Sequence, residues 1–311
     1  MRKARSLAKI SCKLPNAYYR TDNGAAYLGN TLDMIKCIPG DSINLIMTSP
    51  PFALNKKKPY GNVSAPKYVD WFFPFAAEFW RVLKEDGSLV IHIGGSWEKG
   101  LPVRSLYHFE LLLSLCRKMP SNHNFYLAQD FYWFNPAKLP SPAQWVTVNR
   151  FRAKDAVDPI WWLSKTPLPK ANNMKVTHPY SAAMRRLLKD GYNMGPRPSG
   201  HVISSKFQKD MGGAISPNLL VIANTESNSR YLRFCREKKI RVHPARYPVE
   251  LPTFFIRFLT DENDIILDPF AGSNATGEAC EVEKRRWIAF DLEEDYLKGS
   301  MHRFENASLS R

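Results

Sequence analysis

Hydrophobic positions along the chain follow two alternating patterns. Short apolar runs of strand length alternate with longer segments that have the apolar spacing of amphipathic helices. The strand-type runs are Ile43 to Thr48, Ser88 to Ile93, Phe131 to Phe134, Ile160 to Ser164, Ile265 to Leu267 and Trp287 to Phe290. The helix-type segments are Tyr68 to Leu83, Ser105 to Lys118, Ala182 to Asp190 and Asp295 to Phe304. This alternation predicts an α/β fold, with a mixed, mostly parallel sheet and helices on both faces.

Two consecutive prolines end the first strand-type run. Pro50 and Pro51 have no backbone N–H and a fixed φ, so the strand cannot continue past Thr48. The resulting rigid elbow holds the Ser49 hydroxyl and the nearby carbonyls outward as acceptors, with the flat ring of Phe52 beside them. Acceptors beside an aromatic face suit a planar group that carries an amine. On these residues alone, a proline-rich loop with a packed phenylalanine is the alternative.

A second motif follows an apolar run near the other end of the chain. Residues 268–277, Asp-Pro-Phe-Ala-Gly-Ser-Asn-Ala-Thr-Gly, include small residues that let a ligand approach the backbone. Ser273 or Asn274 can cap a helix beginning near Ala275, whose free amides can bind a carboxylate. Asp291 ends the next apolar run, about 20 residues after the loop, where an acidic side chain accepts ribose hydroxyls. The pattern predicts a cradle for a nucleoside-bearing cofactor.

Together the two motifs resemble those of the DNA amino-methyltransferases, which move a methyl group from S-adenosylmethionine to an exocyclic base nitrogen. Residues 48–52 are similar to the catalytic motif and residues 268–273 to the cofactor motif. Their order along the chain looks like the permuted beta class of that family. Ser49 before the prolines and Phe52 after them look most like the cytosine-N4 branch, which is found in type II restriction-modification systems. The likeness covers most of the chain, including residues 243–248 and 27–30.

The resemblance implies the S-adenosylmethionine-dependent methyltransferase fold and a set of site residues. The catalytic set is Ser49, Pro50, Pro51 and Phe52. The cofactor-binding set is Asn30, Thr48, His243, Asp268, Phe270, Gly272, Ser273, Asn274, Thr276 and Asp291. For Asn30, the alternative to cofactor binding is a purely structural role as a helix cap. For His243, the alternative to cofactor binding is contact with DNA. Asn274 stands where the family has a second glycine, and this departure leaves a DNA-binding protein with an inactive methylase fold as an alternative. Adenine-N6 methylation is the nearer alternative.

The implied reaction explains the residue types of the elbow. An exocyclic amine is a poor nucleophile because its lone pair is delocalised into the ring. By resemblance, the Ser49 hydroxyl and the Pro50 carbonyl accept the amine hydrogens and stabilise the charge that develops on nitrogen. Phe52 stacks on the base after the base has left the duplex, and base–aromatic stacking contributes about 1–3 kcal/mol. A core phenylalanine is the alternative for Phe52. Ser49 is thus expected to act as an acceptor, and no general base is identified.

Charge indicates a polyanionic partner. The 311-residue chain has a formal net charge of +15, and residues 165–242 contain 15 Lys and Arg against 4 Asp and Glu. Double-stranded DNA is the expected partner because phosphate neutralisation supplies most non-specific affinity for DNA. The basic stretch is rich in loop-forming residues and occupies the place of the family's target-recognition region. Candidate DNA contacts are Arg197, His201, Lys206 and Lys209, with a solvated loop as the alternative for each.

We expect one catalytic domain with an insertion. The predicted parts are a basic arm (1–14), the catalytic half (15–164), the target-recognition region (165–242) and the cofactor-binding part (243–311). No apolar run is long enough for a membrane span, and the five cysteines lack the spacing of zinc sites or a disulfide framework. These features predict a cytoplasmic protein without a metal. A restriction endonuclease acting on the same DNA site is the expected functional counterpart. A monomer and a dimer both remain open.

Overall fold

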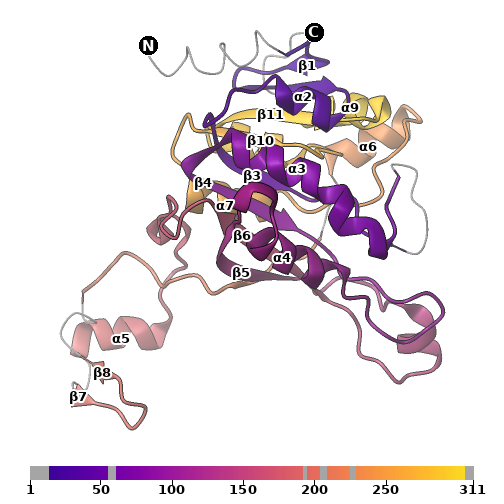
Figure 1. Ribbon diagram of the computed structural model, residues 1–311. Coiled ribbons are helices and arrows are strands. Elements are labelled where there is room, and N and C mark those ends of the chain that lie inside the picture. The colour runs from indigo at the N-terminus through magenta and orange to yellow at the C-terminus, as the bar shows by residue number, and fades with distance from the viewer. Residues whose placement is uncertain (1–13, 55–60, 192–194, 204–208, 225–228, 305–311) are drawn as a thin grey trace. The chain divides into compact units, whose positions relative to one another are not determined.

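A nine-stranded sheet forms the centre of the larger of two units in this computed structural model (Figure 1). The structure describes residues 14–54, 61–191, 195–203, 209–224 and 229–304. Within them, the strands in spatial order are β1 (Tyr19–Arg20), β2 (Gly24–Leu28), β11 (Arg286–Asp291), β10 (Ile265–Asp268), β3 (Ile43–Thr48), β4 (Leu83–His92), β6 (Val157–Ser164), β5 (Tyr126–Phe134) and β9 (Leu219–Val221). Neighbours are parallel from β2 through β4, whereas β1, β6 and β5 introduce antiparallel pairs. The predicted mixed, mostly parallel sheet is confirmed.

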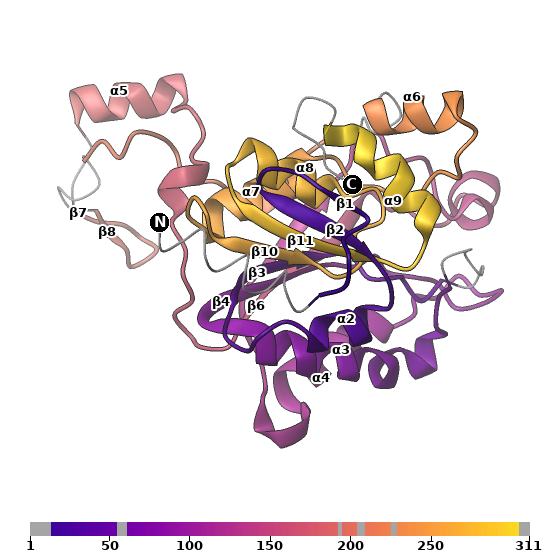
Figure 2. The same ribbon diagram turned by 90° about the horizontal axis from the view of Figure 1, so that it is seen from above.

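Helices cover both faces of this sheet, as predicted, and Figure 2 shows the two layers. One layer contains α2 (Thr31–Lys36), α3 (Tyr68–Val82) and α4 (Tyr107–Arg117). The other contains α6 (Arg230–Glu237), α7 (Glu250–Leu259), α8 (Ala275–Val282) and α9 (Glu294–Ser300), which continues into the single turn η7 (Met301–Phe304). Other short turns are η1 (Ala65–Lys67), η2 (Pro120–Asn122) and η3 (Gln144–Val148). None of the helices described is long and apolar enough to cross a bilayer.

The core beneath α3 explains why this helix forms and how it is oriented. Its buried residues recur at helical spacing, which places one continuous apolar stripe against the sheet. Phe72 and Phe79 on this stripe are fully buried and pack against one another with ring centroids 6.0 Å apart. The helix ends where Leu83 adopts an extended backbone and begins β4 directly. This short connection fixes β4 beside β3, with Thr48 paired to Ile91.

The second unit comprises residues 171–217. It contains the turn η4 (Asn173–Val176), helix α5 (Ala182–Asp190) and a two-stranded hairpin of β7 (Gly195–Pro196) and β8 (Val202–Ile203). Ser181 caps α5, with its Oγ accepting from the Met184 amide at 3.1 Å. A bridge between His178 and Ala214 joins the two ends of the unit. The unit is shorter than the segment 165–242 expected to form the target-recognition region, because β9 and α6 belong to the larger unit.

Candidate active site

A cavity of about 620 Å³ opens where the two sequence motifs meet. The motifs come from opposite ends of the chain, but β3 and β10 are parallel neighbours, with Ile46 paired to Leu267. Both motifs therefore follow carboxyl ends of adjacent strands, where ligands bind in such sheets. The volume is typical of small-molecule sites. The predicted site residues that line it are Asn30, Ser49, Pro50, Pro51, Phe52, His243, Phe270 and Asp291.

The Ser-Pro-Pro-Phe elbow forms one wall of the cavity. The Tyr68 hydroxyl donates to the Pro51 carbonyl at 2.7 Å, which anchors the elbow to α3. Within the part of the chain that the structure describes, the Pro50 carbonyl accepts no hydrogen bond. The Phe52 ring packs closely over Gly94, where a Cβ would lie 2.5 Å from a ring carbon. Among the described residues, the elbow thus presents an unbonded Pro50 carbonyl beside the Phe52 ring, whereas the Pro51 carbonyl is taken by Tyr68.

The remaining predicted cofactor residues lie behind the cavity wall. Thr48, Asp268, Gly272, Ser273, Asn274 and Thr276 are all buried. Asp268 accepts from the Thr276 hydroxyl at 2.6 Å, from the Phe270 amide at 3.2 Å and from the Tyr247 hydroxyl at 3.3 Å. Burial raises the pKa of Asp268 to about 6, against the lowering effect of these donors. Asp268 therefore shapes the loop from beneath.

Asn274 occupies the left-handed backbone region, with φ of 55°. Its side chain accepts from the Gly277 amide at 3.0 Å and donates to the Tyr19 hydroxyl at 2.8 Å. The predicted cap at the start of α8 is therefore Asn274. Asn tolerates this backbone conformation better than most residues with side chains. The departure from glycine is accommodated by local geometry, which weakens the inactive-fold alternative.

Asp291 closes the loop from the neighbouring strand. Its Oδ2 accepts from the Gly272 amide at 2.7 Å, and its Oδ1 accepts from the Glu293 amide at 2.9 Å. Burial is the main cause that raises the pKa of Asp291 to about 7. Glu293 and Leu292 also line the cavity. Glu293 is an acidic residue at this position that the sequence reasoning missed, although it lies only two residues beyond Asp291.

His243 and Asn30 reach the cavity from two further segments. The His243 ring lies over Gly272, where an added Cβ would be 3.0 Å from the ring. Gly272 has φ of +52°, so both its backbone and its surroundings favour glycine. Burial, followed by the charge of Arg246, lowers the pKa of His243 to about 4. The Asn30 side chain accepts a hydrogen bond from the Leu32 amide at 2.8 Å and caps α2. Asn30 also lines the cavity, so it has both the structural role and the position expected of a cofactor-binding residue.

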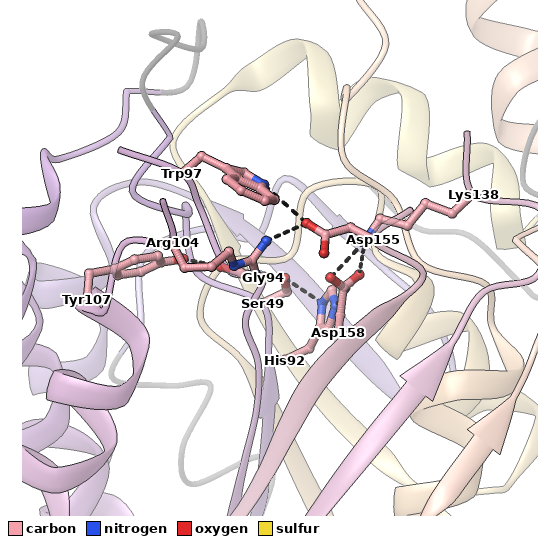
Figure 3. A network of polar contacts seen from close by, with 9 residues as sticks. All are labelled: Ser49, His92, Gly94, Trp97, Arg104, Tyr107, Lys138, Asp155 and Asp158. Atoms are coloured by element: carbon pink, nitrogen blue, oxygen red, sulfur yellow. Dashed lines mark hydrogen bonds and ion pairs between the residues drawn. The ribbon is translucent and has the colours of Figure 1, made fainter. Parts of the chain in front are cut away.

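Beside the elbow lies a polar network that the sequence reasoning missed (Figure 3). The Ser49 Oγ lies 3.0 Å from the Nδ1 of His92, at the end of β4. The His92 Nε2 faces Asp158 Oδ2 at 3.8 Å, and Lys138 Nζ lies 2.8 Å from Asp158 Oδ1. In the sequence, the only sign of this network was a histidine near the end of an apolar strand run. The role of His92 became visible only in the structure, where β4 lies between β3 and β6.

The predicted DNA contacts fall in the second unit. Arg197 and His201 flank one tight turn of the hairpin, with the Arg197 amide donating to the His201 carbonyl at 2.7 Å. Both side chains are exposed, as is that of Lys209. Lys206 lies outside the described residues. The structure therefore brings Arg197 and His201 together on one hairpin.

Comparison with known proteins agrees with the geometry. The sequence matches the DNA methylase family (N6_N4_Mtase) over residues 43–302. It is 48% identical over 295 residues to the type II methyltransferase M.PvuII of Proteus hauseri, covering 94% of this chain and 87% of that protein. Identity to the type II methyltransferase M.BamHI of Bacillus amyloliquefaciens is 28%, covering 88% of this chain and 56% of that protein. The solved PvuII DNA methyltransferase (cytosine-N4-specific) superimposes with a TM-score of 0.74 and 43% identity, covering 93% of this chain and 89% of that one. The methyltransferase fold is confirmed, and the chain belongs to the DNA methylase family.

Proposed function

We propose that this protein transfers the methyl group of S-adenosylmethionine to the exocyclic N4 of cytosine in a specific site of double-stranded DNA. The observation that carries the proposal is that the Ser49 to Phe52 elbow opens into the same cavity as Phe270 and Asp291. A cofactor and an amine held there are adjacent. The name of the PvuII relative, which is cytosine-N4-specific, supports the choice of base.

The residues present fit the cofactor. Asp291 supplies acceptors for ribose hydroxyls, and the aromatic rings of Phe270, Trp71 and Phe75 give the cavity an apolar wall. Gly272 lets the loop pass close beneath His243. When bound, S-adenosylmethionine supplies an electrophilic methyl group on a sulfonium. The protein holds the reacting atoms in line, a positioning effect that contributes several kcal/mol.

The elbow residues have distinct roles in this proposal. The Ser49 hydroxyl and the Pro50 carbonyl accept the two amine hydrogens, which stabilises the charge that develops on nitrogen. Phe52 stacks on the extruded cytosine, and Pro51 maintains the shape of the elbow through its contact with Tyr68. Thr48 supports the elbow from the buried end of β3. The second unit, with Arg197, His201 and Lys209, contributes to DNA recognition within the 165–242 region.

Nucleoside mass spectrometry tests the base assignment. Plasmid DNA treated with the enzyme and S-adenosylmethionine is expected to contain N4-methylcytosine. Adenine-N6 methylation is the competing outcome, since the same acceptors suit either amine. Methyl groups found only on adenine would contradict the cytosine assignment.

The biological setting follows from the reaction. Methylation protects the site from a restriction endonuclease with the same specificity, and we propose that the enzyme works in the cytoplasm as the modification partner of such an endonuclease. No direct contact between the two proteins is required. This proposal is supported by the similarity to M.PvuII and M.BamHI, which are both named type II methyltransferases.

Cofactor affinity is expected to rise with pH through about 7. Asp291 has its pKa raised to about 7, so its carboxyl is protonated below that pH and offers fewer acceptors to ribose hydroxyls. Calorimetric titration of S-adenosylmethionine at pH 6 and pH 8 should show tighter binding at pH 8. Asp291→Asn should bind about tenfold more weakly at pH 8, which corresponds to one hydrogen bond to a charged group.

The Asp291→Asn protein also serves as the control for this pH effect. Titration of the cofactor's own groups is common to both proteins, so only the difference between them reports on Asp291. The pH dependence should be smaller in the variant. Equal pH dependence in the two proteins would remove Asp291 from ribose binding.

A further inference from the structure

The imidazole of His92 is enclosed at the base of the elbow. Three aromatic rings surround it, with centroids 5.3 Å away for Trp133, 5.5 Å for Phe52 and 6.0 Å for Tyr247. The side chain is 7% exposed. Because a buried polar ring needs polar partners, its two nitrogens define what the residue can do. Nδ1 lies within hydrogen-bond distance of Ser49 Oγ, whereas Nε2 makes no hydrogen bond among the described residues and lies 3.8 Å from Asp158 Oδ2.

Asp158 is an anion in this setting. Burial alone would raise its pKa, but His92 and Lys138 outweigh that effect and lower the pKa of Asp158 to about 2. Lys138 Nζ contacts both carboxylate oxygens, at 2.8 and 3.0 Å. A carboxylate near Nε2 favours the tautomer that carries its proton on Nε2. Nδ1 is then the unprotonated nitrogen, and it accepts the hydrogen bond from the Ser49 hydroxyl.

This arrangement supplies a path for the proton that must leave the amine. We propose, on the basis of the function proposed above, that His92 is the terminal proton acceptor of the reaction and that Asp158 is a positioning residue that stabilises its protonated form. Figure 3 shows the chain of contacts from Ser49 through His92 to Asp158 and Lys138. Ser49 touches the substrate, whereas His92 acts through Ser49 and Asp158 through His92.

The step balances as follows. The cytosine N4 forms a bond to the methyl carbon, the bond from that carbon to sulfur breaks, and its electron pair stays on sulfur. N4 then gives one proton to Ser49 Oγ while Ser49 Oγ gives its own proton to His92 Nδ1. The resulting imidazolium has its Nε2–H directed at the Asp158 carboxylate, and the proton later passes to solvent. No oxidant, reductant or metal takes part.

The protonation of His92 itself is the first test, and it uses the free protein. The ring is followed by NMR in histidine-labelled protein, with its signals assigned by their loss in His92→Asn. Removing the Asp158 charge should destabilise the imidazolium, so the protonation curve of His92 should move to lower pH in Asp158→Asn. The other titratable groups near this region are Lys138, which pairs with Asp158, Tyr247, which packs against the His92 ring, and Asp268, which accepts from Tyr247. Loss of the Asp158 charge leaves Lys138 without this partner, and the Lys138 charge then disfavours the imidazolium in the same direction. An unmoved curve would overturn the role of Asp158.

Turnover is the second test. Asn in place of His92 can accept the Ser49 hydrogen bond but cannot take a proton, so His92→Asn separates proton transfer from positioning of Ser49. We expect kcat to fall about 10²-fold or more, the usual contribution of general base catalysis, with unchanged affinity for S-adenosylmethionine. A kcat within about threefold of wild type would overturn the proposal. If His92→Asn does not fold, the pH profile of kcat in Asp158→Asn tests the proposal instead. The acidic limb of that profile should move to lower pH together with the His92 protonation curve measured by NMR, and an unmoved limb would overturn the proposal.

Asp155→Asn is the matched control. Asp155 lies three residues before Asp158, but its carboxylate pairs with Arg104 and accepts a hydrogen bond from Trp97 Nε1 at 3.3 Å. Among the described residues, Asp155 makes no hydrogen bond or ion pair with His92. Its substitution should leave the His92 protonation curve unchanged. The NMR measurement needs neither DNA nor cofactor, so it distinguishes failure of the relay from failure of the proposed function, which the nucleoside analysis reports.

Discussion

Ser49→Ala should lower kcat about 10²- to 10³-fold while leaving the affinity for S-adenosylmethionine unchanged. The expected loss is that of one preorganised polar group at a site of developing charge. Ser49 lines the cavity and contacts His92, so the alanine variant removes both the amine acceptor and the link to the imidazole. Single-turnover kinetics on a duplex with one target site, together with calorimetric titration of the cofactor, measure the two quantities separately.

Ser42→Ala is the control for this experiment. Ser42 is half-buried like Ser49 and precedes the opposite end of β3, where its hydroxyl donates to the Pro39 carbonyl at 2.7 Å. Its loss should cost a similar amount of packing with no effect on turnover. Near-normal turnover in Ser49→Ala would take Ser49 out of the catalytic role.

Asp268→Ala should lower the free energy of unfolding by about 3 kcal/mol and weaken cofactor binding more than tenfold. The Phe270 amide and a buried hydroxyl would lose their acceptor, and each unsatisfied buried group costs about 1–3 kcal/mol. The loop that carries Phe270 and Gly272 would lose its support from beneath. Urea unfolding and calorimetric titration of S-adenosylmethionine measure the two effects.

Asp268→Asn separates hydrogen bonding from charge. The amide keeps the acceptor for Phe270 and a donor for Thr276, so the expected loss is below about 1 kcal/mol. In the wild type the folded pKa of about 6 exceeds the ordinary 3.8, so the folded state binds the proton more tightly. Stability from Asp268 therefore falls as the pH rises from about 4 to about 6 and is constant above. The Asn variant should lack this dependence; equal losses in the Ala and Asn variants would contradict the hydrogen-bonding role.

The elements that the sequence predicted well were those with strong local signals. The strand Ile43–Thr48 and the helix Ala182–Asp190 have the predicted bounds, because a double proline ends the first and a serine cap begins the second. Several short elements were not predicted, including β1, β2 and α2. Their few residues carry too little periodicity. The strand β2 forms by pairing with β11, β1 forms by pairing with β2, and α2 begins at its Asn30 cap.

The sequence by itself determined the two motifs, their order, the α/β class and the family, because prolines, small loop residues and apolar runs act locally. Only the tertiary structure decided that His92 and Asp158 belong beside Ser49. These three residues come from β4, β6 and the end of β3, and nothing in their spacing along the chain indicates that they meet. The order of strands in the sheet sets which side chains become neighbours, and that order depends on the packing of the whole unit. For the same reason the elbow was recognisable from four residues, whereas a destination for the proton emerged only once the sheet was assembled.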